Sequence, residues 1–355
     1  MSKFIQLHML TVYPISNPNR DDLGRPKSAQ FGGVNRLRIS SQSLKRAVRI
    51  SDEMQKELVG HMGDRTQRIG QVISDALLAD AVSEDKAKEI ATKVMEAFGK
   101  VGKKSASGKL QTEQLAFISP DEKALAIDLA RKAASGEALP DKKELAKLVL
   151  RPADGAVDIA MFGRMLADSP EFNREAAVQV SHAMTTHRAE VEDDYYVAAD
   201  DLKTAAEDAG AGFVGTAGYG SGVFYTYACV DRDLLIANLA GDAELARLGT
   251  QAFARALAIS TPSGKKNSFA HQTRAGFIRA EADTVQPRSL AGAFFAPIKG
   301  DDLLTSSIDA LTQTADKMDA AYNAVPEKQA VVNVPAGQGT IEDIMALIDA
   351  AFADL

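Results

Sequence analysis

The sequence contains a single cysteine, Cys229, among its 355 residues. An intrachain disulfide is therefore impossible, and a zinc site built from several cysteines is excluded. Such a chain suits a reducing compartment, so we expect a cytoplasmic protein. No apolar run is long enough to span a membrane, and the first residues alternate in polarity without the apolar core of a signal peptide. We therefore expect no membrane partner.

Familiar catalytic and cofactor motifs are also missing. The glycines between 210 and 222 are not followed by the lysine of a phosphate-binding loop. His182 and His187 lack the spacing of a metal-binding pair and are interpreted as sheet residues. No nucleophile–base pair or metal cluster is recognisable. We accordingly expect no metal, no cofactor and no catalytic residue.

Acidic residues outnumber basic ones overall, but positive charge is concentrated at one end. The chain has a net charge of −7, which taken alone argues against a nucleic-acid binder. The first 50 residues, however, hold nine Lys or Arg against two Asp, a local charge of +7, which leaves −14 for the remainder. This asymmetry indicates a focused basic surface on an acidic body.

The basic residues of this segment follow two periodicities. Arg36 and Arg38 are two apart and share one face of an extended segment. The next group follows the i, i+3, i+4, i+7 pattern of one helical face: Gln42, Lys45, Arg46 and Arg49. Ser40 or Ser41 is a suitable N-cap for that helix, while Leu44 and Val48 face inward. A cationic row that runs from strand to helix suits binding to phosphates.

The remaining pattern predicts a mixed fold of α+β class. Residues 3–12 are predicted as a strand, with Ile5, Leu7 and Met9 on one face, and 52–150 as an insertion of helices. The other predicted strands are 157–162, 176–187, 223–230 and 275–282, and the other predicted helices are 242–259, 301–323 and 340–352. This order favours a ferredoxin-like or RRM-like core that is discontinuous in sequence.

A polar, glycine-rich excursion separates two of the β segments. Tyr195, Tyr196 and Val197 precede it, and Val214 lies among its glycines. An arm of this kind has little core of its own, so its aromatic residues indicate a ligand; packing within the hairpin is the alternative.

The sequence at the basic segment resembles the CasC family, the backbone subunits of the type I-E CRISPR Cascade complex. The match comprises Asn19-Arg20-Asp21-Asp22 and Phe31-Gly32-Gly33 through Arg46, then Val157–Ala160, Gly163-Arg164-Met165, 183–187 and 221–225. The resemblance implies a right-hand shape: an RRM-like palm (1–51, 171–192 and 222–355), helical fingers (52–170) and a thumb hairpin (193–221). It also implies a scaffold that polymerises head-to-tail along CRISPR RNA, whose guide pairs with target DNA.

The resemblance also assigns roles to residues. Ser40, Gln42, Lys45, Arg46 and Arg49 would hold the RNA backbone, with Asn19 and Arg20 on the adjoining loop. Arg164 and Met165 would lie at the fingertip, where Met165 wedges against bases. Tyr195, Tyr196, Val197 and Val214 would displace one nucleotide at regular intervals. Expected partners are CRISPR RNA, target DNA, further copies of the chain and other Cascade subunits.

Several alternatives remain open from the residues themselves. The polar and basic residues at 42, 45, 46 and 49 also fit an ordinary solvent-exposed helix face. Arg36 and Arg38 can pair with acidic neighbours, and Met165 can belong to the core. Asp21 and Asp22 either orient Arg20 or contact a neighbouring subunit, or they bind a metal in a ribonuclease. A third class places the helix in a DNA groove. The glycine-rich arm favours the RNA scaffold, because a groove reader does not need it.

Overall fold

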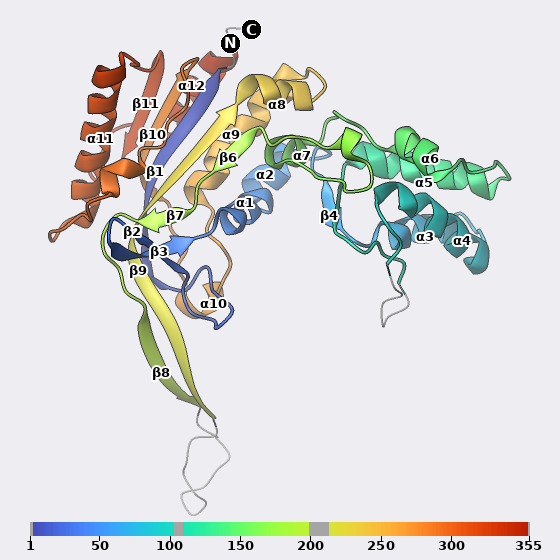
Figure 1. Ribbon diagram of the computed structural model, residues 1–355, viewed down its shortest axis with the longest axis horizontal. Coiled ribbons are helices and arrows are strands. Elements are labelled where there is room, and N and C mark those ends of the chain that lie inside the picture. The colour runs from blue at the N-terminus through green and yellow to red at the C-terminus, as the bar shows by residue number, and fades with distance from the viewer. Residues whose placement is uncertain (1–2, 103–108, 199–212, 354–355) are drawn as a thin grey trace, which may run out of the picture.

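The computed structural model describes residues 3–102, 109–198 and 213–353, and in these residues the chain folds around one large antiparallel sheet (Figure 1). The sheet order is β11-β10-β1-β9-β7-β3-β2, and β6 and β8 also pair with β9. The strands are β1 (Phe4–Ser16), β2 (Ser28–Phe31), β3 (Val34–Ile39), β6 (Val178–Val180), β7 (Ala183–Thr185), β8 (Glu192–Ala198), β9 (Phe213–Asp231), β10 (Ala275–Asp283) and β11 (Lys328–Asn333).

The central strand β1 has both faces buried. Ile5, Leu7 and Met9 point into the larger core, as the alternation predicts. The helices that contribute to this core are α1 (Ser41–Arg49), α2 (Asp52–Glu57), α7 (Val157–Phe162), α8 (Arg232–Asn238), α9 (Ala243–Ile259) and α12 (Ile341–Phe352). The other face packs against α11 (Leu303–Tyr322) and the short helix η3 (Ala291–Phe294). The sheet is thus covered on both sides.

Buried ion pairs hold α11 against the sheet. Glu281 on β10 accepts hydrogen bonds from Arg279 at 2.6 Å and from Arg288 at 2.7 Å. Both arginines also pair with Asp319 on α11, at 3.4 and 2.5 Å. Each buried charge therefore has an opposite partner, which such a location requires.

The helical insertion has a core of its own (Figure 1, to the right). Its elements are β4 (Asp64–Thr66), α3 (Ile69–Ala79), α4 (Glu84–Val94), η1 (Met95–Phe98), β5 (Ala116–Ile118), α5 (Pro120–Ala134) and α6 (Lys142–Val149). Met54 and Leu58 lie in the larger core, so the separate core starts at Ile69 and not at the expected boundary at 52.

Strands β8 and β9 extend away from the sheet as a projecting hairpin (Figure 1, bottom). β9 is one 19-residue strand that begins in the hairpin and ends in the centre of the sheet. Asn17 fixes the base of the hairpin, because its side-chain amide donates to the carbonyl of Gly218 at 2.8 Å. Arg25 adds an ion pair with Asp193 at 3.1 Å. Residues 199–212 of the expected 193–221 arm lie outside the described residues.

Three local predictions were wrong. Residues 157–162 form helix α7 and not a strand; all but Phe162 are buried, so the apolar run carries no useful period. The predicted strand at 176–187 is two short strands, β6 and β7, interrupted at Ser181, whose amide donates to the carbonyl of Tyr227. Strand β11 follows Pro326 in a stretch where no strand was predicted.

Two more small helices complete the description: η2 (Pro170–Phe172) and α10 (Lys266–Phe269). No helix in the described part of the chain combines the length and apolarity needed to cross a bilayer.

Candidate nucleic-acid interface

Helix α1 forms as its sequence predicts. Ser40 is the N-cap, and its hydroxyl oxygen accepts a hydrogen bond from the amide of Ser43 at 3.3 Å. Leu44, Ala47 and Val48 are buried against the core. Because this stripe is buried, the opposite face of α1, which carries the basic residues, faces solvent and the helical insertion.

A cavity of about 520 Å³ lies between that face and the insertion. Four of its lining residues come from α1: Gln42, Lys45, Arg46 and Arg49. The opposite wall brings Arg65, Leu115, Phe117, Phe162, Gly163, Arg164 and Met165. The expected helix row and the expected fingertip residues therefore line one cavity, although more than 110 positions separate them in sequence. No carboxylate is among the lining residues.

Two aromatic rings support the cations of this cavity. The Lys45 ammonium lies 5.9 Å from the centre of the Phe162 ring, and the Arg49 guanidinium lies 5.4 Å from that of Phe117. Burial lowers the pKa of Lys45 from its ordinary value. Arg49 also donates to the buried carboxylate of Asp158 at 3.3 Å. The rings hold the long side chains across the cavity, which reduces the entropy lost when a ligand binds.

Ion pairing differs between this surface and the exposed faces of helices α4 and α5. On the helices α4 and α5, Lys88, Lys93 and Lys132 each pair with a carboxylate one turn away. By contrast, a group of cations around α1 forms no ion pair with any described residue: Arg20, Lys27, Arg38, Lys45 and Arg46. Uncompensated cations gathered on one surface attract a polyanion.

The loop before β2 supports the start of α1. The Asn19 side-chain oxygen accepts a hydrogen bond from the amide of Ser40 at 2.8 Å. The Asp21 carboxylate accepts from the amides of Leu23 and Arg25, at 3.0 and 2.8 Å, and so shapes a turn. Arg20 and Asp22 are exposed. Among the described residues, no group of three His, Cys, Asp or Glu side chains is arranged to hold a metal.

Two expected RNA contacts need correction. Arg36 is completely buried, and it donates to the carbonyls of Phe31, Thr185 and Phe294 at 3.3, 3.1 and 2.8 Å. Arg164 is 6% exposed and pairs with the buried Glu122 at 2.6 Å. A guanidinium enclosed by protein acceptors does not reach a phosphate, so both arginines support the fold around the interface.

The other candidates lie on the surface, with one exception. Met165 is 83% exposed at the rim of the cavity and does not belong to the core. Gln42 and Arg46 are exposed, while Lys45, Arg49 and Arg38 are partly exposed. Ser40 is only 6% exposed and acts as the helix cap.

The hairpin exposes its apolar side chains on both faces. Tyr195 and Val197 point to one face, where Val197 is directly opposite Val214. Tyr196 points to the other face, where its ring lies 6.1 Å from that of Phe213. All five side chains are between 45% and 66% exposed, so packing inside the hairpin does not account for them.

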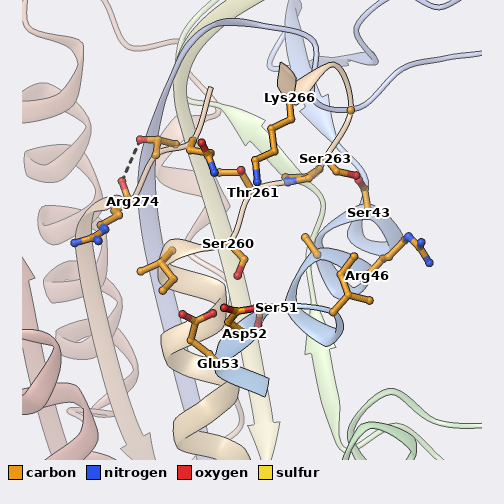
Figure 2. Close-up of a pocket in the computed structure, with 17 residues that line it drawn as sticks. Ser43, Arg46, Ser51, Asp52, Glu53, Ser260, Thr261, Ser263, Lys266 and Arg274 are labelled. Atoms are coloured by element: carbon orange, nitrogen blue, oxygen red, sulfur yellow. Dashed lines mark hydrogen bonds between the residues drawn. The ribbon is translucent and has the colours of Figure 1, made fainter. Parts of the chain in front are cut away.

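A second cavity, of about 630 Å³, lies on the other side of Arg46 (Figure 2). Lys266 extends into it from the 260–274 segment, and Arg274 lies on its far wall (Figure 2). Asp52 and Glu53 lie at the end that adjoins α2. Because this cavity is larger but carries both signs of charge, it suits a polyanion less well than the carboxylate-free cavity.

The broad face of the sheet is closed to bases. Tyr225 and Tyr227 on β9 are 1% and 8% exposed and pack beneath η3 and α11. The Tyr225 hydroxyl is 2.9 Å from Nδ1 of His8 and accepts from the amide of Leu290 at 3.0 Å. Base stacking on a sheet requires exposed aromatic rings, so nucleic acid has access to the α1 side instead.

Sequence reasoning missed four residues of the cavity: Arg65, Leu115, Phe117 and Phe162. Arg65 and Phe117 are directly opposite each other on β4 and β5. Neither strand was predicted within the helical insertion. The adjacency of Phe162 to the Gly163-Arg164-Met165 motif was the one available signal.

Solved structures resemble the chain over almost its entire length. One is a chain of a "CRISPR RNA-guided surveillance complex, pre-nicking", with 30% identity, a TM-score of 0.85 and coverage of 99% of both chains. Another is a chain of a "CRISPR RNA-guided surveillance complex", with 28% identity, a TM-score of 0.71 and coverage of 99% of this chain and 100% of the other. The fold and its basic cavity thus define the class, a Cascade-type backbone subunit.

The chain belongs to the family described as CT1975-like protein (Cas_CT1975), whose model matches residues 5–351. This match confirms the class indicated by the sequence motifs. No curated protein matches the chain in a sequence comparison.

Proposed function

We propose that the chain is a non-catalytic, RNA-binding backbone subunit that holds the ribose-phosphate backbone of a CRISPR RNA in the cavity between α1 and the insertion. The observation that carries this proposal is the cavity itself, whose lining contains no carboxylate. Among the described residues, Lys45 and Arg46 in this lining form no ion pair, and Lys45 lies over the Phe162 ring. Phosphate contacts of this type fix an RNA strand without reading its sequence, as a holder of variable guides requires.

The strand order supports an RRM-like palm. In chain order, β1, α1, the β6–β7 pair, β9, α9 and β10 follow a βαββαβ pattern. The spatial order β10-β1-β9-β7, all antiparallel, is that of a ferredoxin-like sheet. In this arrangement the insertion corresponds to fingers and the β8–β9 hairpin to a thumb.

We further propose that copies stack head-to-tail along one RNA, in the manner of a type I-E Cascade complex in the cytoplasm. The exposed Tyr195, Val197 and Val214 of one thumb would contact the RNA held by the next copy and displace one nucleotide at each interval. The nucleotides between these points would pair with target DNA. Other Cascade subunits would bind at the ends and along the sides of the stack.

The decisive test compares two double variants in RNA binding at several salt concentrations. Lys45→Ala with Arg46→Ala removes two unpaired cations of the cavity, so affinity should fall at least tenfold for every RNA sequence. The slope of log affinity against log salt should fall by about 1.4, or about 0.7 for each lost phosphate contact on a single strand. Lys88→Ala with Lys93→Ala removes the same charge from α4 and should change neither quantity.

Equal binding by both variants would contradict the proposed interface. Incubation of labelled RNA with the protein and Mn²⁺ tests the non-catalytic assignment in parallel. The RNA should remain intact; specific cleavage abolished by Asp22→Ala would overturn that assignment. Purification of the native complex and sequencing of its RNA should yield repeat-derived guides.

A further inference from the structure

The N-terminal end of α1 carries a histidine in a defined tautomer. His182 lies between β6 and β7, is exposed, and directs Nδ1 toward the start of the helix. The amide of Ser41 donates to this nitrogen at 3.3 Å, and a guanidinium nitrogen of Arg38 lies 3.0 Å from it. A backbone amide and a guanidinium can only donate, so Nδ1 must be the acceptor and must lack a proton. The proton of the neutral ring is therefore on Nε2.

The surroundings of the ring maintain this neutral form. Burial, and then the positive charges of Arg38 and Lys27, lower the pKa of His182 from its ordinary value. Neither cation forms an ion pair in the described part of the chain. Protonation of Nδ1 would also break both hydrogen bonds. His182 thus presents a permanent Nε2–H donor, for which no described residue is an acceptor.

Three of the amides at the start of α1 are already occupied. Asn19 accepts from Ser40, His182 accepts from Ser41, and the Ser40 hydroxyl accepts from Ser43. A phosphate therefore cannot use these amides directly, as it does at an open helix N-terminus. Nε2–H is a further side-chain donor that this corner offers to a ligand. Its acidity increases because Nδ1 accepts from a helix amide and a cation.

We propose that Nε2–H of His182 donates a hydrogen bond to a phosphate oxygen of the bound RNA, next to Arg38 and Lys27. This site lies at the N-terminal end of α1. It extends the polar surface that begins at Lys45 and includes Gln42 toward the hairpin. The proposal rests on the proposed function and adds a neutral contact to it. An RNA strand held at both ends of α1 runs from the insertion toward the hairpin.

Two substitutions separate the two functions of the ring. His182→Asn places an amide oxygen where Nδ1 lies, so it retains an acceptor for Ser41 and removes the outward donor. His182→Ala removes both. Thermal unfolding should leave the Asn variant equal to the wild type and lower the melting temperature of the Ala variant by a few degrees, as expected for an unsatisfied helix-start amide.

RNA binding should weaken on the order of tenfold in both variants, as expected for a hydrogen bond to a charged acceptor. The salt slope should not change, because no charge is removed. The ratio of wild-type to His182→Asn affinity should be the same at pH 8 and pH 6. A ratio that grows at pH 6 would identify a histidinium contact and overturn the proposal.

The tautomer is measured without RNA. Nitrogen-15 NMR of histidine-labelled protein, assigned by loss of the signal in His182→Asn, should show a protonated Nε2 and a bare Nδ1 down to pH 6. The opposite tautomer would overturn the proposal. Normal binding by His182→Asn beside weakened binding by Lys45→Ala with Arg46→Ala would also overturn it, yet leave the proposed function intact. If His182→Asn and the Lys45→Ala/Arg46→Ala double variant both bound RNA normally, the proposed function itself would be rejected.

Discussion

The side-chain oxygen of Asn19 accepts a hydrogen bond from the backbone amide of Ser40 at 2.8 Å, which ties the loop before β2 to the N-cap of α1. The two residues are 21 positions apart, and the amide is buried with its residue. Asn19, which sequence reasoning assigned to RNA contact, therefore has a defined structural task at the point where the basic helix begins.

Asn19→Ala should lower the free energy of unfolding by about 1 kcal/mol, because the Ser40 amide loses its acceptor. RNA affinity should fall with an unchanged salt slope. Asn19→Asp is the informative partner: its carboxylate retains the acceptor and is favourable at a helix N-terminus, yet it repels phosphate. It should restore stability and still weaken RNA binding. Chemical denaturation and RNA titration of both variants measure this, and equal RNA affinity in Asn19→Asp and wild type would contradict it.

The buried Arg36 should behave as a structural residue. Arg36→Lys retains the charge, but a single ammonium cannot reach the three carbonyls of Phe31, Thr185 and Phe294. The unsatisfied carbonyls should cost about 2–4 kcal/mol of unfolding free energy. At temperatures at which the Arg36→Lys variant is still folded, the salt slope of its RNA binding should equal that of the wild type. A lower slope without loss of stability would return Arg36 to the interface.

Arg36 also shows how much of the structure could be predicted from the sequence. Its spacing from Arg38 correctly predicts a strand, and α1 follows from a local apolar stripe, a cap and a basic face. Burial of Arg36 depends on the carbonyl of Phe294, which lies 258 positions away and leaves no local pattern. The same reason applies to the cavity, since its two walls come from separate segments that only the tertiary fold brings together.

The two faces of the hairpin should differ in their effects. Tyr195→Ala with Val197→Ala removes apolar side chains from one exposed face and should spare RNA binding by a single copy. Assembly of several copies on a long RNA should fall at least fivefold, as measured by analytical ultracentrifugation. Tyr196→Ala changes the face that packs against Phe213, so it should also destabilise the hairpin by about 0.5–1 kcal/mol. Wild-type assembly by the Tyr195/Val197 variant would contradict a role in contacts between copies.

The buried carboxylate of Asp158 should moderate the charge of the cavity. It pairs with Arg49 at 3.3 Å and accepts from the Gly63 amide at 2.7 Å. Asp158→Asn retains an acceptor for the amide but removes the negative charge, so Arg49 gains a free positive charge. RNA affinity should rise severalfold and the salt slope by about 0.7. Glu84→Gln removes an equal charge from an exposed pair on α4 and should have no such effect. Addition of Arg49→Ala to the Asp158 variant should abolish the gain.

The same carboxylate predicts a pH dependence of stability. Burial raises the pKa of Asp158 to about 6, above its value in the unfolded chain. Between these two pKa values the folded state binds more protons at this group, so the contribution of Asp158 to stability is greatest at low pH and declines as pH rises from about 4 to 6. The decline from this group should be about 3 kcal/mol. Asp158→Asn should lose that part of the pH dependence in denaturation experiments. An identical pH profile in the two proteins would show that Asp158 is ionised throughout this range, and that its pairing with Arg49 outweighs the effect of burial.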